Sequence, residues 1–232
     1  MNPTKSNISK NGSTWHEDNR RGKNAEAFFL CHSTELTGCA VLEPLKQIPR
    51  NEGDFLMMNG EIYEVKADAR RSYLKTGNIC VQISNDKGTS TGFLHDMQDP
   101  ERRHVDKITY VLCLDYECKI PYAVITMAVE KFASLCGCPA GGCGTCGRCT
   151  PGKEGWQREA FPDARLSKNE NVLLLPLSDV LQDDDVHVVV LRDVACRTPV
   201  ERRNYLELVN ADAEKQRGSS GHNYITVHCY GA

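Results

Sequence analysis

The sequence predicts an α/β fold in which a mixed β-sheet is flanked by helices. Three observations indicate this class: a helical apolar repeat at about residues 20–36, a hairpin of two short apolar runs at residues 53–66, and strand-like runs alternating with short helical segments from residue 107 onward. The chain has 232 residues, enough to bury a sizeable core. Since it contains no internal repeat and no long linker, we expect one domain over residues 20–232, preceded by a flexible arm at residues 1–19.

Composition narrows the function only slightly. Charged residues make up 25% of the chain and the formal net charge is −3, so bulk charge gives no support for nucleic-acid binding, although a carboxylate site with local basic patches is compatible with it. No run of about 18 apolar residues is present, and the N-terminus is polar without an apolar signal core. We therefore expect an intracellular, cytoplasmic protein without a membrane span.

The first predicted element is the helix at about residues 20–36. Apolar residues from Ala25 to Leu36 recur at spacings of three and four, and Gly38 gives a stop signal. Glu26 lies beside that apolar face, one turn into the helix. An acidic residue near a helix start often serves only the helix dipole, so an active-site role for Glu26 and a purely local one are both open. Residues 41–48 then form a connector or a short strand.

The loop length of the hairpin decides where its acidic residues lie. Asn59-Gly60 is a strong turn signal between the two apolar runs. A two-residue loop would pair Phe55 with Glu64 and turn Asp54 to the other face of the hairpin, because side chains alternate along a strand. A three-residue loop at residues 58–60, with Gly60 left-handed, pairs Asp54 with Glu64 instead. We predict the three-residue loop.

This pairing gives the hairpin a chemistry. The two carboxylates would lie roughly 5 Å apart at Cβ, with Lys66 two residues beyond Glu64 on the same face. Mg²⁺ takes oxygen ligands, so Asp54 and Glu64 would hold it, and the Val65 carbonyl would add another ligand. Lys66 would orient a water or neutralise charge developing on a phosphate. The plain alternative is a surface hairpin whose acidic residues are merely solvated.

These residues resemble the motif of the PD-(D/E)XK nuclease superfamily, in the form Gly53-Asp54 followed by Glu64-Val65-Lys66. Gly53 stands where the family has proline. The resemblance spans about residues 20–135 and implies a restriction-endonuclease-like mixed sheet flanked by helices, Glu26 as a further catalytic residue, and a third core strand at residues 76–82. In similar phage-type nucleases that strand often ends in glutamate, where this chain has Gln82.

The activity implied by the resemblance is that of a Mg²⁺- or Mn²⁺-dependent deoxyribonuclease. An endonuclease is favoured over an exonuclease because no helicase or clamp module accompanies the core. A restriction-type or junction-resolving role would suit a phage- or virus-encoded protein. DNA is the expected partner, and the oligomeric state, a homodimer included, is left open.

A basic segment follows the proposed catalytic lysine, where the substrate backbone would lie. The alternative is an exposed basic loop without a ligand. The candidate DNA-binding residues are Arg70, Arg71, Lys75 and Asn78, and Tyr73 between them is a further group able to meet phosphate.

The chain contains twelve cysteines, and five of them crowd into a glycine-rich stretch, at positions 136, 138, 143, 146 and 149. In a reducing compartment such crowding indicates a metal site, and Cys-x-x-Cys pairs are typical of structural zinc. We predict a zinc knuckle as an insertion at residues 136–158, with either Cys136 or Cys138 as the spare thiol. The expected ligands are Cys138, Cys143, Cys146 and Cys149. The same spacing also fits an iron–sulfur cluster.

The remaining elements follow from the apolar runs. We expect a buried strand at residues 107–114, a returning strand at residues 120–127, a short helix at residues 128–135, and strands at residues 171–177 and 187–191. Ser178 would cap a short helix, and Thr198-Pro199 with Glu201 opens a long helix that ends at Gly218. Residues 224–230 would add an edge strand. Cys31, Cys80 and Cys113 are interpreted as small core residues.

Two other functions compete with the nuclease. A zinc-containing module with a degenerate nuclease core would bind DNA or a protein regardless of Mg²⁺ and would cleave nothing. A redox protein would carry an iron–sulfur cluster on the cysteines and would be brown.

Overall fold

The computed structural model describes residues 15–45, 53–68, 72–84, 105–135, 171–191, 196 and 198–218. This part of the chain forms an α/β structure with a mixed six-stranded sheet, a two-stranded sheet and five helices. The large sheet has the order β1 (Val41–Pro44), β2 (Phe55–Met57), β3 (Ile62–Asp68), β5 (Lys107–Cys113), β6 (Pro121–Ala128) and β8 (His187–Val190). The small sheet pairs β4 (Asn78–Ser84) with β7 (Asn171–Pro176). The helices are α1 (Trp15–Thr37), α2 (Ser72–Thr76), α4 (Val129–Leu135), α6 (Leu177–Leu181) and α7 (Pro199–Gly218).

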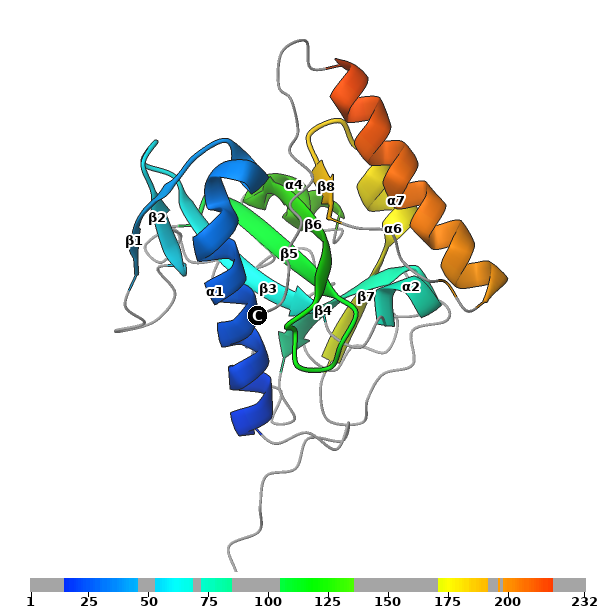
Figure 1. The fold of residues 1–232 in the computed structure, drawn as a ribbon, viewed down its shortest axis with the longest axis horizontal. Coiled ribbons are helices and arrows are strands. Elements are labelled where there is room, and N and C mark those ends of the chain that lie inside the picture. Colours follow the sequence, from blue (N-terminus) through cyan, green and yellow to red (C-terminus); the bar gives the residue numbers. More distant parts are fainter. Residues whose placement is uncertain are drawn as a thin grey trace, which may run out of the picture.

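Helix α1 covers one face of the large sheet (Figure 1). Its Phe29 ring is fully buried, with its centroid 5.5 Å from that of Phe55 on β2 and 5.7 Å from that of Tyr63 on β3. The helix begins at Trp15, so residues 15–19, which the sequence assigned to a flexible arm, are helical. Glu17 and Asp18 in the first turn suit a helix start because acidic side chains there complement the helix dipole.

Strand β5 is the centre of the large sheet, parallel to β3 and antiparallel to β6. All its residues from Ile108 to Cys113 are buried, as expected of a strand covered on both faces. The prediction that residues 76–82 form the third strand of the core sheet is wrong. Strand β4 pairs with β7 in the small sheet, and β5 takes the position beside β3. The alternation of buried Ile79 and Val81 with exposed Cys80 suits a sheet covered on one face.

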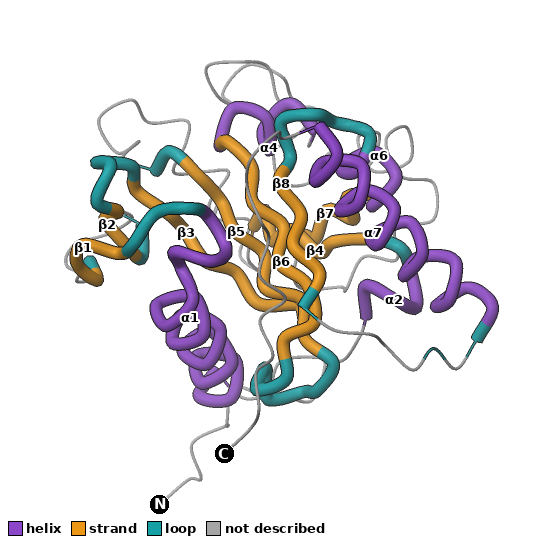
Figure 2. Tube along the Cα trace, turned by 45° about the horizontal axis from the view of Figure 1, so that its top comes forward, coloured by secondary structure: helices purple, strands orange, loops and turns teal. Residues whose placement is uncertain are grey.

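The other face of the large sheet packs against α2, α4, α6, α7 and the small sheet. Their buried side chains form one core with the facing residues of β5 and β6, including Tyr73, Ile79, Phe132, Val180 and Leu208. The small sheet lies on the same side of the molecule as α2 and α7 (Figure 2). The strands predicted at residues 107–114, 120–127, 171–177 and 187–191 and the helix predicted at residues 128–135 are confirmed, with small differences in their bounds, as β5, β6, β7, β8 and α4.

The helix starts show one correct and one wrong prediction. At α7, the Glu201 N–H donates to Thr198 Oγ1 and the Thr198 N–H donates to Glu201 Oε2, both at 3.1 Å, which is the predicted capping box. At α6, Pro176 occupies the cap position without a side-chain hydrogen bond, and Ser178 lies inside the helix, where its hydroxyl contacts Asp179 Oδ1 at 3.2 Å. Ser178 is therefore not a cap.

The cysteines predicted to be in the core divide between core and surface. Cys113 is fully buried, whereas Cys31 and Cys80 are exposed. Cys31 lies two residues after buried Phe29 on α1, which turns its side chain away from the sheet. The predicted knuckle at residues 136–158 and the predicted edge strand at residues 224–230 lie outside the described residues. No helix in the described ranges is long and apolar enough to cross a membrane.

Candidate active site

The hairpin has the three-residue loop that the sequence predicted. Phe55 lies opposite Tyr63, and the Gly60 N–H donates to the Met57 carbonyl at 2.9 Å. Gly60 has a φ of +85°, the left-handed conformation that this loop requires. Asp54 lies one residue before this ladder, where its own N–H donates to the Tyr63 carbonyl, so it stands next to β3 at the residue before Glu64 without being paired in the register.

Asp54 lies just before β2 and is tied to the neighbouring strand through its side chain. The Val65 N–H donates to Asp54 Oδ2, and the Asp54 N–H donates to the Tyr63 carbonyl, both at 2.8 Å. Only 9% of the residue is exposed. Burial and the charges of Glu64 and Glu26 raise its pKa to about 7, although the hydrogen bond from Val65 and the charge of Lys66 act in the opposite direction. Asp54 is therefore a buried carboxyl group in a negatively charged surrounding.

Glu64 and Lys66 form an ion pair along β3. Lys66 Nζ contacts Glu64 Oε1, and the exposed fractions of the two side chains are 41% for Lys66 and 17% for Glu64. The pair is possible because residues two apart on a strand share a face. Burial lowers the pKa of Lys66, but the charges of Glu64, Asp54 and Glu26 outweigh it, so that the pKa is raised and the side chain is an ammonium at neutral pH.

Gly53 bends the chain into the site. Its φ is +81°, and a Cβ at this position would lie 2.6 Å from Ile62 Cγ2 and 3.1 Å from the Tyr63 carbonyl oxygen. Proline, the residue that the resemblance would place here, has φ fixed near −65° and cannot take this conformation. Glycine is therefore required at position 53, because the backbone there lies close to the start of β3.

Glu26 lies within electrostatic range of the pair without joining it. Helix α1 packs on the face formed by Tyr63 and Val65, whereas Glu64 and Lys66 alternate to the other face. Glu26 Oε2 pairs with Lys23 Nζ at 2.6 Å. Among the described residues, no group of three or more His, Cys, Asp or Glu side chains is close enough to hold a metal ion. A catalytic role for Glu26 therefore stays a prediction.

The donor set on the hairpin fits a hard divalent cation such as Mg²⁺ or Mn²⁺. Asp54 accepts from Val65 through Oδ2, so Oδ1 is left to bind a cation. Glu64 contacts Lys66 through Oε1, so Oε2 is left to bind a cation. Both are carboxylate oxygens, which Mg²⁺ combines with several waters rather than with a full protein cage. The structure shows Val65 acting through its N–H, and ligation by its carbonyl stays a prediction.

The predicted DNA-binding residues are placed in part. Lys75 is exposed on α2, and half-buried Asn78 opens β4, with its Nδ2 donating to the Thr76 carbonyl at 3.1 Å. Both elements lie on the side of the large sheet to which Glu64 and Lys66 point. Tyr73 is 1% exposed in the core, so it does not contact phosphate as we expected. Arg70, Arg71 and the four predicted zinc ligands Cys138, Cys143, Cys146 and Cys149 lie outside the described residues.

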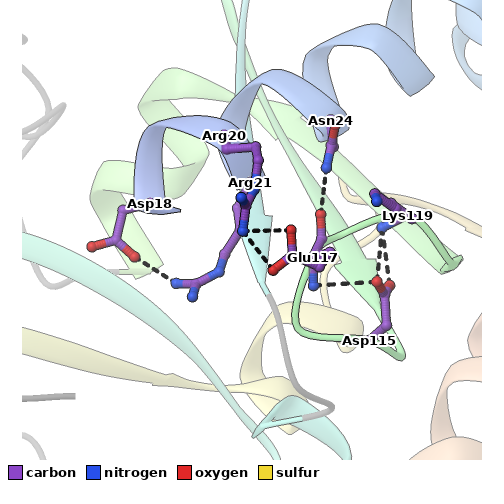
Figure 3. A network of polar contacts seen from close by, with 7 residues as sticks. All are labelled: Asp18, Arg20, Arg21, Asn24, Asp115, Glu117 and Lys119. Carbon is purple, nitrogen blue, oxygen red and sulfur yellow. Dashed lines mark hydrogen bonds and ion pairs between the residues drawn. The ribbon is translucent and has the colours of Figure 1, made fainter. Parts of the chain in front are cut away.

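A polar network that the sequence analysis missed anchors the first turns of α1 to the turn between β5 and β6 (Figure 3). Asn24 Nδ2 donates to the Glu117 carbonyl at 2.6 Å, and Arg20 pairs with the Glu117 carboxylate at 2.7 Å. The Arg21 guanidinium lies 3.2 Å from the centroid of the Tyr116 ring. Asp115 could have indicated this turn from the sequence, because aspartate commonly closes such turns. Its carboxylate accepts hydrogen bonds from backbone N–H groups of the turn. This network fixes the position of the helix that carries Glu26.

A scan of protein-family models and a search of curated proteins each found no match to this chain. The function must therefore be argued from the geometry and charge of the hairpin.

Proposed function

We propose that this protein is a metal-dependent deoxyribonuclease that hydrolyses phosphodiester bonds at the hairpin of β2 and β3. The observation that supports the proposal is the hairpin with its three-residue loop, in which the Asp54 carboxylate accepts from the Val65 N–H and lies within the charges of Glu64 and Lys66. A two-residue loop would have separated the two carboxylates and left no common ligand position.

The charge balance of the site supports a divalent cation. Burial and the charge of Glu64 raise the pKa of Asp54 to about 7, and the charge of Lys66 does not fully offset them. A cation of charge two between Asp54 and Glu64 would favour the ionised form of both groups. When bound, Mg²⁺ or Mn²⁺ would polarise the phosphoryl oxygen and make a bound water a better nucleophile.

The protein residues supply binding and orientation. Asp54, fixed by the Val65 N–H, and Glu64 would hold the cation, and the Lys66 ammonium would neutralise charge on the phosphate or orient the attacking water. Exposed Lys75 on α2 and Asn78 on β4 lie on the same side of the sheet and would contact the DNA backbone together with Arg70 and Arg71. Zinc on the cysteine knuckle would be structural, since thiolates fill its coordination shell.

The direct test is cleavage of supercoiled plasmid and of an end-labelled duplex in the presence of Mg²⁺. We expect nicked and linear plasmid from the wild type, as an endonuclease gives, and a rate lower by about a hundredfold or more for Asp54→Asn and Lys66→Ala. Glu43→Gln is the matched control, because Glu43 is an exposed acid on β1 of the same sheet. Equal activity in all four proteins would reject the nuclease. Tight DNA binding without cleavage, unchanged by Mg²⁺, would indicate the binding module instead.

A further inference from the structure

Lys66 occupies the position of a counterion for the carboxylates of the hairpin. Its Nζ contacts Glu64 Oε1. The charge of Lys66 lowers the pKa of Asp54, whereas the charges of Glu64 and Glu26 raise it. A metal ion held by Asp54 and Glu64 would need the same carboxylate that the lysine now contacts. The metal would bind Glu64 Oε2 while Lys66 contacts Oε1, so two cations would share one carboxylate and repel each other, which weakens the ion pair when the metal binds.

We propose that Lys66 is a resident counterion that a divalent cation displaces from Glu64, so that metal binding and release of the Lys66 ammonium towards the phosphate are a single event. This inference rests on the proposed function, because it concerns the same site. It adds an order: Lys66 is held by Glu64 until the metal has bound, and only then is it available to substrate.

The geometry of β3 lets this exchange happen by side-chain rotation alone. Lys66 is paired in the sheet with Tyr110 of β5, and Glu64 with Ile108, so the backbone of both residues is fixed. The Lys66 side chain is 41% exposed and has a flexible four-carbon stem, whereas the Glu64 side chain is only 17% exposed. The lysine can therefore leave while the glutamate stays in place for the metal.

The test compares the Mn²⁺ affinity of the full-length wild type with that of full-length variants at Lys66. We expect Lys66→Met, which keeps the stem and removes the charge, to bind Mn²⁺ about tenfold more tightly, because the repulsion between two nearby cations is gone. Lys66→Arg keeps the charge and should stay within roughly threefold of the wild type. Lys131→Met is the matched control, since Lys131 of α4 forms a similar ion pair, with Asp183 after α6, at 2.7 Å. Titration calorimetry and the loss of the free Mn²⁺ paramagnetic resonance signal give independent readings, and Asp54→Asn identifies the heat that belongs to this site.

The outcomes distinguish a failure of the inference from a failure of the proposed function. Tighter Mn²⁺ binding by Lys66→Met, with binding by Lys131→Met unchanged, supports the displacement. This holds even if the wild type cleaves no DNA, a result that would reject only the nuclease. Equal or weaker binding by both Lys66→Met and a second neutral variant, Lys66→Gln, overturns the displacement while the site keeps its metal. If neither the wild type nor Lys66→Met binds Mn²⁺ at this site, the displacement and the nuclease are both wrong.

Discussion

The Asp54 carboxylate accepts a hydrogen bond from the Val65 N–H at 2.8 Å, so a side chain continues the hairpin ladder where the backbone of β2 has not yet begun. The same carboxyl group is 9% exposed and lies in the field of Glu64. Asp54 thus has two roles that substitutions can separate. Asparagine keeps an acceptor for the Val65 N–H and removes the charge, whereas alanine removes both.

The first prediction concerns pH. Asp54 titrates near 3.8 in the unfolded chain and at about 7 in the folded protein, so between these values the folded state binds more protons. Its contribution to the free energy of unfolding therefore falls as pH rises from about 4 to about 7 and is level above. We expect Asp54→Asn to gain stability relative to the wild type as pH rises from about 5 to about 7 in metal-free buffer, measured by urea denaturation. Glu43→Gln should show no such trend. A stability difference between wild type and Asp54→Asn that is independent of pH would contradict the assigned environment of Asp54.

The second prediction concerns metal and stability. A ligand that binds only the folded state stabilises it by about 2.7 kcal/mol at a hundred times its dissociation constant. We expect Mg²⁺ to raise the melting temperature of the wild type at about pH 8, where Asp54 is ionised, and to do so less at about pH 5. Asp54→Asn and Glu64→Gln should lose most of this gain. An equal ionic strength of KCl controls for screening, and an equal rise in all three proteins would place the metal elsewhere.

The third prediction concerns Gly53. A Cβ there would meet Ile62 Cγ2 at 2.6 Å, and the φ of +81° is itself unfavourable for any other residue. We expect Gly53→Ala to lower the free energy of unfolding by about 3 kcal/mol, a left-handed cost of about 1 kcal/mol together with a steric cost of about 2 kcal/mol. Gly60→Ala isolates the first term, because Gly60 has φ +85° and nothing within 4 Å of its added Cβ. Equal losses in the two variants would show that the chain at Gly53 adjusts without strain.

Features set by residues close together in the sequence could be predicted, and features set by contacts between distant segments could not. The hairpin loop was predictable because Asn59-Gly60 leaves few turn geometries, and face alternation then fixed Glu64 and Lys66. The partner of β4 was not, because a strand with one buried face can pair with several others, and only the tertiary packing brings it beside β7. The contact between Asn24 and Glu117, 93 residues apart, has no local signature either.

The site itself divides in the same way. The approach of Asp54 to the strand that carries Glu64 needed only the loop length, since both residues belong to the hairpin segment. The relation of Glu26 to them depends on how α1 crosses the sheet, which the network at Glu117 sets through contacts distant in sequence. The bend at Gly53 also needed coordinates, because its steric neighbours Ile62 and Val105 come from two other segments.

The last prediction compares two residues that sequence alone treats alike, Thr198 and Ser178. Both stand at or near the start of a helix. Thr198 accepts the backbone N–H of Glu201 at 3.1 Å, and Glu201, 2% exposed, accepts in return from the Thr198 N–H, whereas α6 has no side-chain cap. We expect Thr198→Ala to lower the free energy of unfolding by about 1 kcal/mol and Ser178→Ala by at most about 0.5 kcal/mol, since Ser178 is an exposed residue inside α6. Urea denaturation of the two variants beside the wild type gives both values. A larger loss at Ser178 than at Thr198 would mean that α6 begins two residues later than the structure places it and that the serine is its cap after all.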